Sequence, residues 1–237
     1  MKITFIGTSH GVPEPHRQCT CIMVEAGKNV YFLDMGTSPV GTLRNRGICM
    51  DAIKGIFITH MHGDHTNGLI PFVDILGWYF KTPDPVICLP DLAAADLISS
   101  WLKTTLNNSS KTIKYRAVQS GEVFNDGTLK VTAFATLHCP NSYAYLLETD
   151  GKSVLFTGDL QLPRVDFPRV AETRRIDLLI CEAAHFPATE YLPVLEKCDI
   201  GRVCVTHYSP RFHQSVFDLQ EARKDLIIAT DDLELHI

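Results

Sequence analysis

Several short apolar runs in this chain lead directly into a histidine or an aspartate, and this arrangement constrains the fold more than any other feature. The run 55–59 is followed at once by the segment His60-Met61-His62-Gly63-Asp64-His65. Other apolar runs lead to His138, Asp159 and His207. Side chains at strand ends and in the loops that follow can converge on one point while a rigid sheet supports them. The pattern therefore predicts strands whose ends meet at a common site.

The segment 60–65 has the composition of a metal site. His60, His62, Asp64 and His65 are all of ligand type, and imidazole and carboxylate groups are ligands that Zn²⁺, Mn²⁺ and Fe²⁺ accept. His60 and His62 are two residues apart, so they point the same way if the strand continues through them. The chain has 10 histidines, and three of them would rarely fall within six residues by chance. We therefore expect metal ligands here rather than surface histidines.

Periodicity and turn residues predict sheet layers covered by helices. No linker, repeat or charge block divides the chain, so we expect one domain over residues 1–237. Helices are expected at 38–45, 67–76, 91–106 and 215–224, and a polar loop at 107–110. Strands are expected at 2–6, 20–25, 29–33, 55–59, 86–89, 112–117, 129–134, 143–148, 153–156, 177–181, 202–205, 226–228 and 233–237.

Charge and cysteine usage exclude some classes of protein. The net charge of −5 argues against a broad basic face for nucleic acid, although a metal site could still attract RNA. No apolar run is long enough for a signal peptide or a membrane span, so we expect a cytoplasmic protein whose 8 cysteines are reduced. Cys19 and Cys21 lack a second pair at zinc spacing and are interpreted as packing residues.

The order of the ligand-type residues resembles the metallo-β-lactamase superfamily. The segment 60–65 resembles its second motif, and His138, Asp159 and His207 resemble its third, fourth and fifth motifs. The resemblance covers nearly the whole chain. It implies an α/β fold, the four-layer αβ/βα metallo-β-lactamase sandwich, with the metals at the edge between the two sheets.

The same resemblance implies a ligand set for two divalent ions. His60, His62 and His138 would hold one ion, and Asp159 would bridge to the second. The second ion would be held by Asp64, His65 and His207. Zinc is the expected metal, with manganese and iron as alternatives.

Three segments narrow the resemblance to the ribonuclease Z group. They are 5–13 together with Arg17, 57–65 and 206–212. A further segment, 177–183, resembles the part of that group that carries a catalytic glutamate, which is Glu182 in this chain. The group's long tRNA-binding arm is missing, because only residues 139–158 separate His138 from Asp159. The His-Ser-Thr segment of the group is also missing. The chain is therefore more similar to small phosphodiesterases of this branch that lack the arm.

These features predict a dinuclear metal-dependent hydrolase that acts on a small or cyclic phosphodiester. Asp64 would bind metal and orient the nucleophile, while Glu182 and His185 are the other catalytic candidates, with His185 protonating the leaving group. His213 is a weaker candidate for the same proton transfer. His10 and His16 could line the mouth of the site, and Ser209 and Arg211 could contact the substrate phosphate.

Three alternatives stay open at this point. The chain could be a ribonuclease Z-type tRNA 3′-endonuclease, a thioester or lactam hydrolase, or a metal-binding protein without catalysis. The expected partner is a small phosphodiester; RNA is not favoured, no membrane is expected, and the resemblance permits a homodimer.

Overall fold

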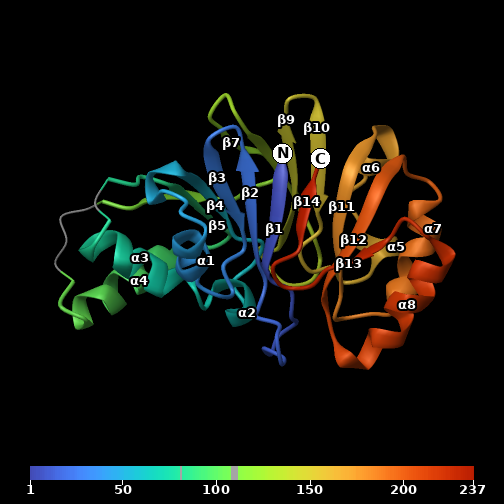
Figure 1. Ribbon diagram of the computed structural model, residues 1–237, viewed down its shortest axis with the longest axis horizontal. Coiled ribbons are helices and arrows are strands. Elements are labelled where there is room, and N and C mark those ends of the chain that lie inside the picture. The colour runs from blue at the N-terminus through green and yellow to red at the C-terminus, as the bar shows by residue number, and fades with distance from the viewer. Residues whose placement is uncertain (81, 108–111) are drawn as a thin grey trace.

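Two β-sheets packed face to face form the centre of the molecule, and helices cover their outer faces (Figure 1). The computed structural model describes residues 1–80, 82–107 and 112–237. The four layers follow the order helix, sheet, sheet, helix, which is the αβ/βα sandwich expected from the sequence. Each sheet must bury both faces in this arrangement, and the long apolar strands meet that requirement.

The first sheet has seven strands in the order β14-β1-β2-β3-β4-β5-β6. Strands β14, β1, β2 and β3 pair antiparallel, whereas β3, β4, β5 and β6 pair parallel. The parallel part brings the carboxyl ends of β3, β4 and β5 to the same edge. The bounds are β1 Lys2–Gly7, β2 Cys21–Ala26, β3 Asn29–Leu33, β4 Ile53–Phe57, β5 Val86–Leu89, β6 Lys114–Ala117 and β14 Glu234–His236.

The second sheet also has seven strands, in the order β13-β12-β11-β10-β9-β8-β7. Strands β7 to β10 form an antiparallel meander, and β10 to β13 are parallel. The bounds are β7 Gly121–Asn125, β8 Lys130–Ala135, β9 Tyr143–Thr149, β10 Lys152–Phe156, β11 Ile176–Ala183, β12 Ile200–Tyr208 and β13 Ile227–Ile228.

Large aromatic side chains fill the space between the sheets. Phe57 of β4 packs edge-on against Phe124 of β7, with ring centroids 5.3 Å apart, and Tyr31 meets the same ring at 5.9 Å. Tyr145 of β9 lies 6.0 Å from Phe57 and donates its hydroxyl proton to the carbonyl of Ile58 at 2.6 Å. These contacts tie the second sheet to the chain just before His60.

Helices flank each sheet on its outer side (Figure 1). Helices α1, α3 and α4 cover the first sheet, and α5 to α8 cover the second. The bounds are α1 Val40–Asn45, α2 Gly63–Thr66, α3 Leu69–Trp78, α4 Ala93–Thr104, α5 Pro163–Asp166, α6 Val170–Thr173, α7 Leu192–Leu195 and α8 His213–Ala222; the 3₁₀ turns are η1 Met50–Ala52, η2 Ala188–Tyr191 and η3 Pro210–Phe212.

Some sequence expectations were wrong in detail. Strand β4 ends at Phe57, so His60 and His62 do not lie on a continued strand. Strand β7 and helices α2, α5, α6 and α7 were not expected; four-residue helices are too short to show a helical period. Of the predicted polar loop, 108–110 lie outside the described residues. Among the described residues, no helix has the length and apolarity needed to cross a membrane.

Candidate metal centre

Five segments bring histidines and aspartates together at one edge between the sheets. The loop after β4 carries His60 and His62, and α2 carries Asp64 and His65. His138 follows β8, Asp159 follows β10, and His207 lies at the end of β12. The seven side chains named from the sequence as ligand candidates thus meet at this edge.

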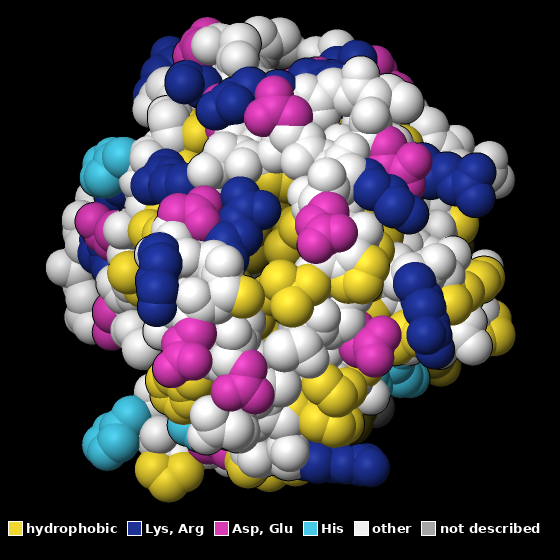
Figure 2. All heavy atoms as spheres, turned by 90° about the vertical axis from the view of Figure 1, so that its right-hand side faces the viewer, with side chains coloured by type: hydrophobic (Ala, Val, Ile, Leu, Met, Phe, Trp, Pro, Cys, Tyr) yellow, Lys and Arg dark blue, Asp and Glu magenta, His cyan; other side chains and the backbone are white. Residues whose placement is uncertain are grey.

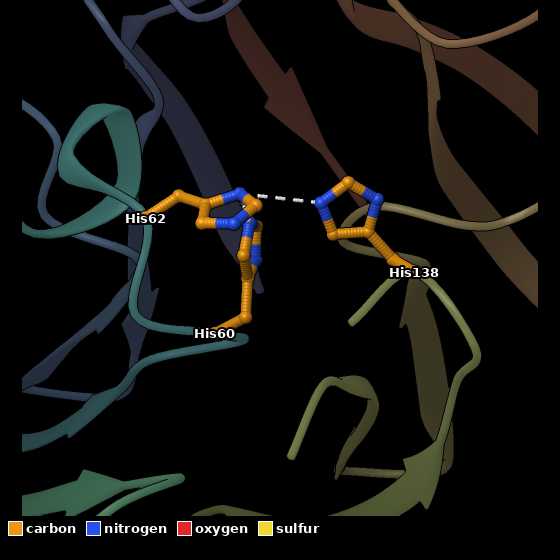
Figure 3. Close-up of side chains that lie close together, drawn as sticks. All are labelled: His60, His62 and His138. Carbon is orange, nitrogen blue, oxygen red and sulfur yellow. Dashed lines mark hydrogen bonds between the residues drawn. The ribbon is translucent and has the colours of Figure 1, made fainter. Parts of the chain in front are cut away.

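The first group of side chains is His60, His62 and His138 (Figure 3). The Nδ1 atom of His62 lies 3.0 Å from Nε2 of His60 and 3.2 Å from Nε2 of His138. One nitrogen from each ring lies within 4.8 Å of the others, which is close enough for one ion to contact all three. His60 is fully buried and His62 is exposed, so this group opens toward solvent.

The second group is Asp64, His65 and His207, and Asp159 lies between the two groups. The Oδ2 atom of Asp64 is 3.5 Å from Nε2 of His65 and 3.7 Å from Nε2 of His207. The Asp159 carboxylate is 3.5 Å from the same two imidazole nitrogens of the second group. Its Oδ2 atom is also 3.7 Å from His60 and from His138 in the first group.

Buried polar partners orient three of these rings. Nδ1 of His65 is 2.7 Å from the carboxylate of Asp34, a fully buried residue. Nδ1 of His60 is 3.0 Å from the Thr59 hydroxyl, and Nδ1 of His207 is 2.7 Å from the Thr20 hydroxyl. With Nδ1 occupied in this way, the Nε2 atoms face the cluster and remain available as ligands.

Asp34 is a residue of the candidate site that was not named from the sequence. It directly follows strand β3, so the rule that selected the other candidates, an acidic or histidine residue after an apolar strand, also applies to it. Its carboxylate also accepts hydrogen bonds from the backbone N–H and the hydroxyl of Thr59. One buried carboxylate therefore supports both His65 and the segment that carries His60.

Unpartnered buried atoms indicate that the cluster suits a cation. Nε2 of His65 and Oδ1 of Asp159 are buried and have no hydrogen-bond partner. Burial lowers the pKa of His60 to about 2, so its ring is neutral and can donate a lone pair. Burial alone would lower the pKa of His65, but the charges of Asp159 and Asp34 outweigh it and raise that pKa well above its ordinary value, so the two buried carboxylates favour positive charge at this point. The donor set of imidazole and carboxylate groups fits divalent metal ions.

Unusual backbone conformations bring these segments close together. Gly158 has a φ of +55°, and a Cβ atom there would lie 2.8 Å from the Thr59 side chain. A Cβ at Gly36 would lie 1.7 Å from the carbonyl oxygen of Asp64. His207 itself has a φ of +45°, a strained conformation for a residue with a side chain, and its N–H donates to the Thr8 carbonyl at 2.9 Å. Glycine at 36 and 158 allows the approach that the cluster needs.

Glu182 and His185 form a hydrogen-bonded pair beside the cluster. Glu182 is buried and its carboxylate accepts the Nδ1–H of His185 at 2.8 Å and the N–H of Leu160 at 2.8 Å. The His185 ring lies 4.6 Å from the ring of His138, and 38% of its side chain is exposed. Burial alone would lower the pKa of His185, but its hydrogen bond to Glu182 and the Glu182 charge outweigh this and raise it to about 9. His185 is therefore a proton-bearing group at the open side of the cluster.

The weaker candidates do not join the metal-capable groups of the described residues. His213 stacks on Tyr208 at 5.6 Å, and the Ser209 hydroxyl donates to the Ala184 carbonyl at 3.4 Å. The Arg211 guanidinium lies 5.0 Å from the centre of the Phe212 ring. His10 is 3.7 Å from Glu14, and His16 is exposed. Cys19 and Cys21 are buried and free, as expected of packing residues.

The chain is similar to a protein family and to several curated and solved proteins. The family model described as "Anti-Pycsar protein Apyc1" matches residues 1–224. A ribonuclease Z of Synechococcus sp. is 31% identical over 178 residues, which cover 69% of this chain and 55% of the relative. The matches to the first curated relatives span about half of those relatives' length.

The solved structures share the fold. The short form of human tRNase Z superposes with a TM-score of 0.79 at 21% identity, covering 100% of this chain and 99% of that one. YhfI from Bacillus subtilis, a metallo-β-lactamase fold protein, superposes with a TM-score of 0.78 at 16% identity, covering 99% of this chain and 98% of that one. Zn²⁺-bound PqqB from Methylobacterium extorquens superposes with a TM-score of 0.71 at 13% identity, covering 100% of each chain.

Proposed function

Because the chain belongs to the family described as Anti-Pycsar protein Apyc1, within the metallo-β-lactamase superfamily, we propose that it is a dinuclear metal-dependent phosphodiesterase acting on a small or cyclic phosphodiester. The observation that carries the proposal is the position of Asp159 between two groups of side chains that could each hold an ion. The exposed His185 beside those groups adds a proton donor on the open side.

Seven side chains form the proposed ligand set. One ion would be held by His60, His62 and His138, the other by Asp64, His65 and His207, with Asp159 shared; zinc is the proposed metal. Two divalent ions in such a site would lower the pKa of a water molecule and offset the negative charge of the phosphate.

The chain's own residues would then orient the nucleophile and supply a proton. Asp64, 13% exposed, can accept a hydrogen bond from the attacking water and orient it. His185 directs Nδ1–H to Glu182, which leaves Nε2 as the atom that can donate a proton to the leaving oxygen. Glu182 acts as a positioning residue, because its other hydrogen bonds, to the N–H groups of Leu160 and Ala184, keep its carboxylate in place.

The short hairpin beside the site and the negative net charge of the protein favour a small substrate over tRNA. Only the hairpin β9–β10 lies between His138 and Asp159, and Lys152 is its one basic residue. The basic residues Lys114 and Arg116 of β6 are already engaged, with Asp84 and with the carbonyl of Val123. With a net charge of −5, the protein would attract tRNA weakly at long range.

The test is a substrate panel with the zinc-loaded protein at about physiological ionic strength. It would contain cyclic nucleotides, a chromogenic diester, the matching monoester, a thioester and a tRNA precursor. We expect the cyclic nucleotides or the simple diester to be turned over fastest, because a diester brings a single negative charge to the site. The monoester brings a second charge and should act mainly as an inhibitor.

Two outcomes would overturn the proposal. Turnover of the monoester at or above the rate of the diester would exclude a phosphodiesterase. Specific cleavage of the tRNA precursor at its 3′ boundary, faster than any small diester, would favour the ribonuclease Z alternative, which the similarity to ribonuclease Z proteins keeps in view.

A further inference from the structure

A cavity on the outer side of the second sheet has no part in the proposed phosphodiesterase site. It has a volume of about 320 Å³ and lies among α5, α6 and α7. Its buried lining includes Pro163, Phe167 and Val194. Figure 2 looks onto this face of the molecule and shows charged side chains around apolar surface near its middle. The cavity therefore combines an apolar floor with a charged rim.

The rim carries three basic side chains, Arg164, Arg169 and Lys197, and one acidic side chain, Glu172. Among the described residues, none of these four side chains has an ion pair within 4.0 Å or a side-chain hydrogen bond. Nearby basic residues on the same side of the molecule behave differently. Arg174 pairs with Glu148, and Arg175 pairs with Asp199 at 2.9 Å. The three cations at the cavity are thus left without an ion pair, and with Glu172 as the only acidic side chain of the lining they outnumber the negative charge there.

Unpaired cations gathered at one hollow create a positive potential that a ligand can reach, here in a protein with a net charge of −5. Guanidinium groups bind phosphate oxygens through two parallel hydrogen bonds, and an ammonium group adds a point charge. The apolar floor would cover a non-polar part of the same ligand. This combination suits an organic phosphate better than a bare inorganic ion.

We propose that the cavity among α5, α6 and α7 is a binding site for a small organic phosphate with an apolar or aromatic part. Arg164, Arg169 and Lys197 hold the phosphate, and Pro163, Phe167 and Val194 contact the apolar part. The site is separate from the proposed metal ligands, since none of them lines the cavity. It does not depend on the proposed phosphodiesterase activity.

The site can be tested by titrating the ¹⁵N-labelled, zinc-loaded protein with phenyl phosphate and, separately, with inorganic phosphate. The pH should be about 8, where the phosphate is a dianion. We expect saturable shifts of the amide signals of α5, α6 and α7, with tighter binding of phenyl phosphate than of inorganic phosphate. Any binding at the metals would shift a different set of signals, around Asp159 and His207.

Variants separate specific binding from general charge. The double variant Arg169→Gln, Lys197→Gln should raise the Kd of phenyl phosphate at the cavity at least tenfold. Arg174→Gln removes a nearby cation that lies outside the cavity and is paired with Glu148, so it should leave the Kd within twofold of wild type. Both sets of side chains are exposed, and an unchanged remainder of the spectrum would show that the fold is intact.

No saturable shift at α5–α7, or an equal Kd in the double variant and in wild type, would mean that these cations are only solvated and would overturn the site. Equal binding of both probes would remove the role of the apolar floor and so contradict the ligand class. Turnover of a chromogenic diester by the double variant reports separately on the proposed function, because the changed residues lie outside the metal cluster.

Discussion

At the scale of single residues, the main feature of the candidate site is that the two nitrogens of an imidazole ring have different partners. Nδ1 of His60, His65 and His207 meets a buried oxygen, and Nε2 faces the cluster. Nδ1 of His185 also meets a buried oxygen, that of the Glu182 carboxylate, but the His185 ring is partly exposed. In the proposed function, the same side-chain chemistry would support ligation at three positions and proton transfer at the fourth.

The proposed role of His185 as proton donor predicts that replacing it lowers kcat by an amount that depends on the leaving group. His185→Gln should lower kcat for a diester with a poor alkoxide leaving group about 10²–10⁴-fold, because general acid catalysis is then lost. A diester with a good nitrophenolate leaving group should be affected far less. The measurement is kcat for both substrates, together with zinc content by elemental analysis.

His213→Gln is the matched control for that experiment. His213 stacks on Tyr208 and is not part of a metal-capable group, so both rates should remain close to wild type. An equal loss on both substrates in His185→Gln, or a loss of zinc, would show that His185 does not act as the general acid.

At the scale of elements, short pieces of structure hold the strand ends in place. Helix α5 is only four residues long, yet its last residue, Asp166, accepts backbone N–H groups from both loops beside it. Its Oδ2 atom lies 2.8 Å from the nitrogen of Leu137 and 2.9 Å from that of Gln161, and Oδ1 lies 3.1 Å from the nitrogen of Leu162. These residues are close in sequence to His138 and Asp159, so α5 connects two loops of the candidate site.

Asp166→Asn should therefore disturb both stability and metal binding. The amide offers one acceptor oxygen in place of two, so at least one part-buried N–H loses its partner, at a cost of about 1 kcal/mol in unfolding free energy. Zinc affinity should fall about tenfold or more, because the segments carrying two ligands are loosened. Denaturant unfolding and competition with a chromogenic chelator measure the two effects.

Asp218→Asn on the exposed surface of α8 is the control, because within the described residues the Asp218 carboxylate has a hydrogen bond only from Gln214. If Asp166→Asn unfolds more easily but binds zinc with wild-type affinity, α5 supports the fold without positioning the ligands.

The turn between β7 and β8 predicts a pH-dependent contribution to stability. Asp126 accepts the N–H groups of Thr128 and Leu129, each at 2.9 Å, and the hydroxyl of Tyr31 at 2.7 Å. Burial alone would raise the pKa of Asp126, but these hydrogen bonds outweigh it and lower the pKa. The native pKa is below the unfolded value of about 4, so the stabilisation is present above pH 4 and is lost as the pH falls through the native pKa.

Asp126→Asn should lower the free energy of unfolding by about 1 kcal/mol at pH 6 and by progressively less toward pH 3. Urea unfolding across this pH range checks the trend. Asp150→Asn, in the turn between β9 and β10, is the matched control, because the Asp150 side chain has no hydrogen bond within the described part of the chain. If the loss in unfolding free energy caused by Asp126→Asn were the same at pH 3 and at pH 6, the ionised Asp126 carboxylate would not be the source of the stabilisation.

At the scale of the whole molecule, the proposed ligands join the two sheets. His60, His62, Asp64 and His65 follow strand β4 of the first sheet. His138 and Asp159 follow strands of the second sheet, and His207 lies at the end of its strand β12. Ions held between them would cross-link the two halves of the sandwich. Metal binding should therefore stabilise the whole fold as well as the site.

Removal of metal tests this coupling. The purified protein should contain close to two ions per chain, and chelation should lower Tm by about 10 °C, since a ligand at a thousand times its Kd contributes about 4 kcal/mol. His62→Ala should lower the metal content. Well-folded protein with one ion or none, and a Tm that does not respond to chelator, would contradict the dinuclear assignment.

The sequence by itself was sufficient for the layered architecture and for the seven ligand candidates. Long apolar strands cannot be solvated, so the sandwich follows from the burial they require, and the superfamily resemblance gave its layer order. Most strands lie within a few residues of their expected positions, because apolar periodicity is a local property. His185 was also named from its position three residues after Glu182, and the two are hydrogen-bonded.

Only the tertiary structure decided how the site is supported. Asp34, Thr20 and Asp166 are distant in sequence from the segments they hold, and a hydrogen bond between distant segments leaves no local pattern. The placement of His60 and His62 was also decided by the tertiary structure, because their rings meet although strand β4 ends before them. Local periodicity reports which face of an element is buried, whereas the distances within a site depend on how separate elements pack against one another.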